Sequence, residues 1–270
     1  MTFAYTVRLC PIAFNIAKHD RCPVSPHTMS MFIASCAGSY SGSALANYTC
    51  SVRAWHIIHG TDWNMDQQVK ATLEGAVRLA SSVSKKALRA PMTIATLETL
   101  NRILDSSQPL DVAVRAALNV MFYSLARTGE LTVPSQPAFD IAAHVKLENM
   151  QDDVDRNGFP FRVLHLPRTK SAPDAGKDIV FASQSGPLDP WVALQDHLHI
   201  NDPPHQAHLF TYKADGKHKP LTKPVFIRWL NEAATTLSIG HIKGHSICIG
   251  GTLEFLLRGI AFEVVKSLGR

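Results

Sequence analysis

The segment from Leu110 to Glu130 reads LDVAVRAALNVMFYSLARTGE and decides the fold. Up to Ala126 its apolar residues occupy almost every side of the helix that the pattern predicts, which is typical of a helix buried all round. The four residues RTGE, 127–130, follow this helix, and we expect Gly129 to be its left-handed cap. The segment therefore predicts the buried central helix of a mixed domain, with an arginine and a glutamate just beyond its end.

Arg127 has two explanations on sequence alone. A cation at the C-terminal end of a helix commonly caps the last carbonyl groups. Alternatively, the nearby carboxylate of Glu130 holds the guanidinium as a fixed fork for a phosphate.

Upstream of this segment the sequence predicts a small helical domain. Ser25 and Pro26 are typical of a helix start, and we expect further helices over 43–59, closed by Gly60, and over 65–80. The buried face of the second of these helices is predicted to carry Tyr48, Val52, Trp55 and Ile58. Residues 1–24 form an expected extension, and Pro91 marks a predicted domain boundary.

Downstream of the central helix the pattern changes to strands. Residues 161–166 and 178–181 flank a turn-rich segment and predict a β-hairpin. The remainder is predicted to be helical, over 189–198, from Thr222 onward, over 245–258 and over 261–268. Trp229 is expected to be a core residue of the helix that starts at Thr222. Four histidines in this part are expected to lie in a solvated polar loop: His197, His199, His205 and His208.

Composition and charge limit the class of protein. The chain has 270 residues, 46% of them hydrophobic and 18% charged, which is an ordinary globular balance. Its longest apolar run, 112–126, is broken by three polar residues, so we expect no contact with a membrane. The five cysteines show no paired short spacing, which is typical of a reducing, intracellular compartment.

The net charge of +5 is concentrated at the front of the chain. Residues 1–107 hold ten Lys or Arg and six Asp or Glu, whereas 108–270 hold seventeen and sixteen. Because Lys and Arg bind nucleic acids by neutralising phosphates, a basic front part fits a polyanionic partner. A basic surface without a partner is the alternative at this modest charge.

Two further places contain chemically suggestive residues. Lys170 lies in the turn of the predicted hairpin, where a lysine can act as a general acid, contact a phosphate or simply be solvated. The stretch GHSICIGG, 244–251, puts His245 at a helix start and Cys248 on the same face. Its two adjacent glycines weaken a helix, so we expect them to permit a close approach of backbone or ligand.

The order RTGEL, hairpin lysine, GHSICIGG resembles that of the tyrosine recombinase (phage integrase) family, most closely the recombinase-like proteins of fungal mobile elements. The resemblance covers about Ser25 to Arg270. It implies a mainly α fold with a small β-sheet, in which a helical core-binding (SAM-like) domain at 25–90 precedes a tyrosine-recombinase catalytic-type domain at 91–270.

In that family two arginines, a lysine and a histidine surround the scissile phosphate, and a tyrosine attacks it. Fixed cations there stabilise the negative charge that spreads over the phosphate oxygens. The resemblance implies that Arg127 is the first arginine, with Glu130 as its supporting carboxylate. It likewise implies that Lys170 is the hairpin lysine and His245 the motif histidine.

The sequence departs from the family pattern at two points. Cys248 stands where the second arginine belongs, and a neutral thiol cannot donate a bidentate fork. The nucleophilic tyrosine would fall beyond residue 270, and all five tyrosines precede His245: Tyr5, Tyr40, Tyr48, Tyr123 and Tyr212. We therefore expect a catalytically impaired homologue, truncated before its nucleophile.

The leading hypothesis is a protein that binds double-stranded DNA without a cofactor or metal. We expect a nuclear protein, monomeric in solution, for which oligomerisation on DNA stays open. Six basic residues of the front domain and its link are candidate phosphate contacts: Arg53, Lys70, Arg78, Lys85, Lys86 and Arg89.

Two alternatives stay open. In the first alternative, the chain is a fragment of an active recombinase, although truncation does not explain Cys248. Otherwise His241, His245 and Cys248, spaced at i, i+4 and i+7, line one helical face as a metal or thiol site.

Overall fold

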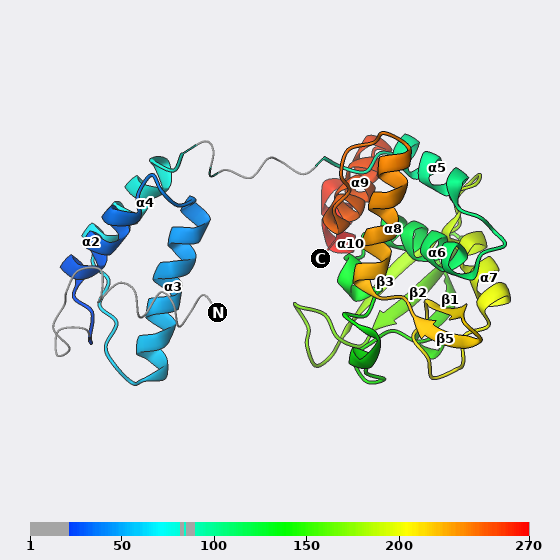
Figure 1. Ribbon diagram of the computed structural model, residues 1–270, viewed down its shortest axis with the longest axis horizontal. Coiled ribbons are helices and arrows are strands. Elements are labelled where there is room, and N and C mark those ends of the chain that lie inside the picture. Colours follow the sequence, from blue (N-terminus) through cyan, green and yellow to red (C-terminus); the bar gives the residue numbers. More distant parts are fainter. Residues whose placement is uncertain (1–21, 82–83, 85–89, 270) are drawn as a thin grey trace. The chain divides into compact units, whose positions relative to one another are not determined.

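The computed structural model describes residues 22–81, 84 and 90–269. The chain divides into two compact units, Met1–Leu88 and Arg89–Arg270 (Figure 1). The first 21 residues of the predicted extension lie outside the described residues.

The first unit is helical throughout its regular elements, as the sequence predicts. Its helices are α2 (Pro26–Cys36), α3 (Gly42–Ile58) and α4 (Gln67–Arg78). Each helix begins with a polar cap, and Ser25 accepts a hydrogen bond from Thr28 N at 3.1 Å, as expected for a helix start. Helix α4 packs against both α2 and α3 around a core that includes Met29, Ile33, Leu45 and Val69.

The buried face of α3 differs from the predicted one. Ile58 is 73% exposed, and Trp55 stacks over His59 on the surface rather than joining the core cluster. His56 is buried instead, because both of its ring nitrogens have backbone partners: Nδ1 bonds Val52 O at 2.8 Å and Nε2 accepts from Val24 N at 3.0 Å. The predicted face is right at Tyr48 and Val52, but a hydrophobic period that ignores histidine extended it wrongly to Trp55 and Ile58.

The second unit is built around α6 (Pro109–Tyr123), in which every residue from Ala116 to Tyr123 is buried. This confirms the predicted central helix, which contacts α7, α9 and β4. The surrounding helices are α5 (Ile94–Ile103), α7 (Pro190–Asn201), α8 (Lys223–Thr236), α9 (Gly244–Leu257) and α10 (Phe262–Gly269). Trp229 of α8 packs partly buried against the core, as predicted. Among the residues described, no helix is both long and apolar enough to cross a membrane.

The sheet of the second unit has three antiparallel strands in the order β1, β2, β3. Strands β2 (Pro160–Leu166) and β3 (Lys177–Ala182) form the predicted hairpin, with Leu164 opposite Ile179. Strand β1 (Met150–Val154) was not predicted, because its residues are almost all exposed and lack an alternating apolar pattern.

A second hairpin corrects the prediction that the chain is only helical beyond residue 189. Strands β4 (Thr211–Ala214) and β5 (Lys217–Pro220) pair through a turn in which Asp215 and Gly216 have φ values of 53° and 68°. An Asp-Gly pair with two positive φ angles is the preferred two-residue hairpin turn. The dipeptide was therefore a signal that the sequence reading missed.

Two of the histidines predicted to be solvated are buried near this hairpin. His197 donates from Nε2 to Leu209 O at 2.9 Å, and Asn201 Nδ2 donates to its Nδ1 at 3.0 Å. His208 accepts from Phe210 N at 3.2 Å, while its Nε2 has no hydrogen-bond partner. Burial lowers the pKa of His197 to about 4 and that of His208 to about 3.

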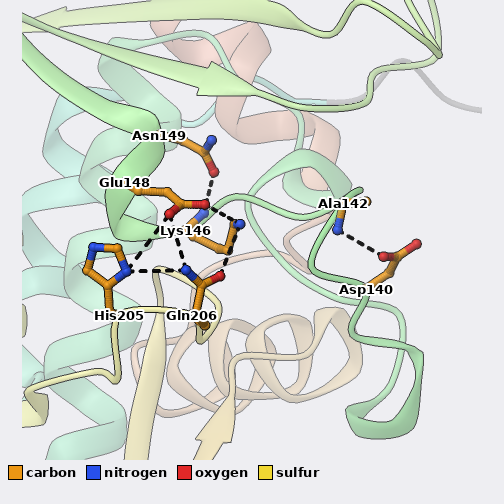
Figure 2. A network of polar contacts seen from close by, with 7 residues as sticks. All are labelled: Asp140, Ala142, Lys146, Glu148, Asn149, His205 and Gln206. Carbon is orange, nitrogen blue, oxygen red and sulfur yellow. Dashed lines mark hydrogen bonds and ion pairs between the residues drawn. The ribbon is translucent and has the colours of Figure 1, made fainter.

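A buried lysine ties the segment before β1 to the loop before β4 (Figure 2). The side chain of Lys146 is 9% exposed, and its ammonium binds Glu148 and donates to Gln206 Oε1 at 3.4 Å. Gln206 in turn donates to Glu148 at 3.3 Å, and Asn149 accepts from Lys146 N at 2.9 Å. The hydrogen bond from Lys146 lowers the pKa of Glu148. We call these residues, Lys146, Glu148, Asn149 and Gln206, the lysine clamp.

Candidate functional site

The chain turns sharply between the end of α6 and Arg127. The residue in the left-handed region is Leu125, with φ of 55°, and not Gly129 as predicted. Ala126 N donates to Met121 O at 3.1 Å, which closes the end of the helix. A left-handed conformation costs a non-glycine residue roughly 1–2 kcal/mol. The side chain of Leu125 is buried in the core, which holds the turn in place.

Arg127 lies beyond the helix end and is held by a carboxylate. Its backbone N donates to Glu130 Oε2 at 2.8 Å and its Nη1 donates to Oε1 at 3.1 Å. The Glu130 side chain is 8% exposed, whereas that of Arg127 is 40% exposed. Of the two explanations for Arg127, the geometry matches the guanidinium fixed by Glu130. A buried carboxylate thus orients a cation that still reaches the surface.

The start of α9 lies directly against this turn. Thr128 Oγ1 donates to Gly244 O at 3.0 Å, and His245 is the next residue along the helix. A Cβ added at Gly244 would lie 2.4 Å from Thr128 Oγ1, so only glycine permits this approach. Arg127 and His245, 118 positions apart in sequence, are therefore brought together by their neighbours Thr128 and Gly244.

Two adjacent hollows share Arg127 and His245. The first has a volume of about 210 Å³, and we call it the thiol hollow because Cys248 lies in its wall. It is lined by Leu125, Arg127, His245, Cys248, Ile249, Thr252 and Gly269. The second has a volume of about 310 Å³, and we call it the cationic hollow. It is lined by Arg127, Thr128, Gly129, Lys223, Lys243, Gly244 and His245.

Cys248 is 8% exposed and directly contacts His245. Its Sγ lies 3.3 Å from His245 Nδ1 and donates to His245 O at 3.3 Å. Burial raises the pKa of the Cys248 thiol, with a smaller opposing effect of backbone hydrogen bonds and Arg127. The group at this position is therefore a neutral thiol near pH 7.

The arrangement of the proposed metal or thiol ligands differs from the predicted one. His241 precedes the first residue of α9, so it does not share a helical face with His245 and Cys248. Within residues 22–81, 84 and 90–269, no three His, Cys, Asp or Glu side chains are placed to hold a metal ion together.

The paired glycines of α9 act as predicted. A Cβ at Gly250 would lie 2.0 Å from Met92 O, and one at Gly251 would lie 2.1 Å from Phe122 O. Backbone contact is further secured by Met92 N, which donates to Ser246 O at 2.9 Å. The missing side chain of Gly251 thus lets α9 pack onto the backbone of α6, and that of Gly250 lets it pack onto Met92, ahead of α5.

Lys170 lies apart from the other two predicted residues. It is exposed in the connection between β2 and β3, which projects from the second unit, and it lines neither hollow (Figure 1). Thr169 is buried and closes the turn by accepting from Ala172 N at 3.1 Å. The structure therefore unites Arg127 and His245 but does not place Lys170 with them.

Two lysines of the cationic hollow were missed by the sequence reading. Lys223 is the first residue of α8, and Lys243 is the residue before α9. A signal for Lys243 was present, because it immediately precedes GHSICIGG. Lys223 offered none, since only the folded chain brings the start of α8 to Arg127.

The candidate phosphate contacts of the first unit are only partly described. Arg53, Lys70 and Arg78 are exposed on α3 and α4. Arg53 and Lys70 line one hollow of about 340 Å³, together with Trp63 and Met65. The other three candidates, Lys85, Lys86 and Arg89, lie outside the described residues.

No model of a known protein family and no curated protein sequence matches the chain. Solved structures do. A λ integrase dimer bound to a COC′ core site matches with a TM-score of 0.60 and 12% identity, over 99% of this chain and 82% of that one. The Tn1549 transposon integrase in complex with transposon right end DNA has a TM-score of 0.58 and 12% identity, over 100% and 85%.

The chain has the tyrosine recombinase fold. The XerH site-specific recombinase bound to a palindromic difH substrate shares it, with a TM-score of 0.52 and 10% identity over 99% of this chain and 72% of that one. At such identities the likeness concerns the fold alone. It confirms the predicted fold class, mainly α with a small antiparallel sheet.

Proposed function

We propose that the protein binds double-stranded DNA through its backbone phosphates, with Arg127 and His245 at the centre of the contact. The observation that carries this proposal is the joint position of these two side chains in the walls of both hollows. An arginine fixed by a carboxylate presents planar donors suited to phosphate oxygens. The similar structures named above are themselves DNA complexes, which supports the same ligand.

The exposed basic residues of the first unit fit the same partner. Arg53 and Lys70 share a hollow, and Arg78 lies further along α4. Contacts of lysine and arginine with phosphates position a protein on DNA without reading its sequence. We expect the protein to be a monomer before it meets DNA.

We further propose that strand cleavage is impaired, on the basis of Cys248. Phosphoryl transfer needs fixed cations where negative charge develops. Removal of one such donor costs about 3–4 kcal/mol of transition-state stabilisation in comparable sites. Because the Cys248 thiol is buried and neutral, it supplies no positive charge to the thiol hollow.

Fluorescence anisotropy with a labelled random-sequence duplex tests the proposed function. Affinity is measured at about 50 and 200 mM salt, because each phosphate contact changes the ratio of the two affinities by about 3.5-fold. Arg127→Gln removes a guanidinium and should lower the ratio of the two affinities by about 3.5-fold, the effect of one phosphate contact. No binding of the unmodified protein at about 50 mM salt would overturn the proposal.

Cys248→Arg is the complementary variant in the same assay. An added guanidinium in the thiol hollow should raise the salt ratio by about 3.5-fold, as expected for one further phosphate contact. Cys248→Ser is the matched control, because it keeps the size of the side chain and adds no charge. An arginine that changes nothing would show that no phosphate reaches this hollow, and the argument for impairment would fail.

A further inference from the structure

The two hollows beside Arg127 and His245 differ in charge. The thiol hollow adds only uncharged residues to this pair, whereas the cationic hollow adds Lys223 and Lys243. None of the described residues that line the cationic hollow is acidic. Glu130, the partner of Arg127, is 8% exposed and is not part of that lining. The excess of positive charge therefore lies on the side away from Cys248.

Both lysines extend from backbone that is fixed. Lys223 N donates to Val133 O at 2.8 Å, directly after the cap residue Thr222. Lys243 O accepts from Ser246 N at 2.8 Å, and the preceding Ile242 N donates to Asn231 Oδ1 at 3.0 Å. A lysine on fixed backbone keeps its ammonium within reach of one place, even though the side chain itself is exposed.

Neither lysine forms an ion pair with a carboxylate in the part of the chain that the structure describes. Among the ion pairs of the described residues, lysines contact carboxylates at Lys146, Lys219 and Lys266, but not at Lys223 or Lys243. Two exposed ammonium groups beside a guanidinium repel one another, and an anion between them relieves this repulsion. The cationic hollow is thus built for a ligand with negative charge.

We propose that Lys223 and Lys243, together with Arg127, bind a DNA backbone phosphate in the cationic hollow and so supply the positive charge that Cys248 does not. This inference rests on the proposed function, because it takes the anion to be a phosphodiester of the same DNA. It assigns a role to two lysines that lie outside RTGEL, the hairpin turn and GHSICIGG.

The test is the salt dependence of DNA binding by the full chain. Lys243→Gln and Lys223→Gln should each lower the ratio of affinities at about 50 and 200 mM salt by about 3.5-fold, one phosphate contact per lysine. The effect should be equal for duplexes of unrelated sequence, because a phosphate contact reads no bases. Lys243→Arg keeps the charge and should retain the unmodified ratio.

Lys217→Gln is the matched control, since Lys217 is an exposed lysine on β5 that lines neither hollow. All of these variants alter exposed side chains, so their melting temperatures should equal that of the unmodified protein. If the unmodified protein binds DNA and the Lys223 and Lys243 variants behave like Lys217→Gln, this inference is wrong and the proposed function stands. If the unmodified protein fails to bind, both fall together.

Discussion

The lysine clamp and the cationic hollow place lysines of the same unit in opposite surroundings. Lys146 is buried, and its ammonium forms an ion pair with Glu148 and donates a hydrogen bond to Gln206. Lys243 is exposed beside two other cations and has no carboxylate partner among the described residues. A lysine whose charge is neutralised within the protein stabilises the fold, whereas one left unpaired in a hollow is available to a ligand. Sequence alone does not separate these two roles.

Acid should lower the free energy of unfolding of the second unit, because two buried histidines lie close to the lysine clamp. His208, in the loop that pairs with Lys146, has a folded-state pKa of about 3, and nearby His197 has one of about 4. As the pH falls below the unfolded value of about 6.5, the unfolded chain binds protons that the folded chain does not, so stability decreases. The expected loss between pH 6.5 and 4 is on the order of a few kcal/mol.

Urea unfolding at a series of pH values measures this loss. His208→Asn keeps an acceptor for Phe210 N but cannot titrate, so its free energy of unfolding should depend less on pH in this window. His199→Asn is the control, because His199 is an exposed histidine of α7. An unchanged pH profile in the His208 variant would mean that the buried ring is not the source of acid sensitivity.

The sequence predicted the elements that bury a regular apolar pattern. The central helix and the hairpin of β2 and β3 were found because their core positions recur with a helix or strand period. Strand β1 and the hairpin of β4 and β5 were missed, because they are short and mostly polar. His197 and His208 were misplaced because a histidine is polar in sequence yet buried once its nitrogens are bonded or desolvated.

The candidate site was predictable only in its local parts. Arg127, Glu130 and His245 stood out through motifs, and the structure joins them through the contact of Thr128 with Gly244. That contact spans 116 positions and involves no apolar period, so no local pattern reveals it. Lys223 lies at the site because the packing of the second unit places the start of α8 there, and no local sequence pattern indicates this packing.

Lys146→Ala is the direct test of the clamp. It removes a buried aliphatic stem and the ammonium that holds two loops together, and should lower the free energy of unfolding by about 2 kcal/mol. The salt dependence of DNA binding should stay unchanged, in contrast to Lys243→Gln. Lys217→Ala, at an exposed position, should alter stability by less than about 0.5 kcal/mol. A Lys146 variant that loses a phosphate contact would erase the distinction between the two regions.

The smallest expected effect concerns Thr128, which we infer positions Arg127 against His245 without touching the ligand. Thr128→Val keeps the shape of this buried side chain but cannot donate to Gly244 O. The loss of this hydrogen bond should reduce the free energy of DNA binding by about 1 kcal/mol, which lowers the affinity roughly fivefold. Thr128→Ser retains the hydroxyl and should restore most of the affinity. The number of phosphate contacts is unaltered, so the salt slope should not change in either variant. A steeper or shallower slope in Thr128→Val would show that the hydroxyl meets the phosphate itself, and Thr128 would then be a ligand contact rather than a positioning residue.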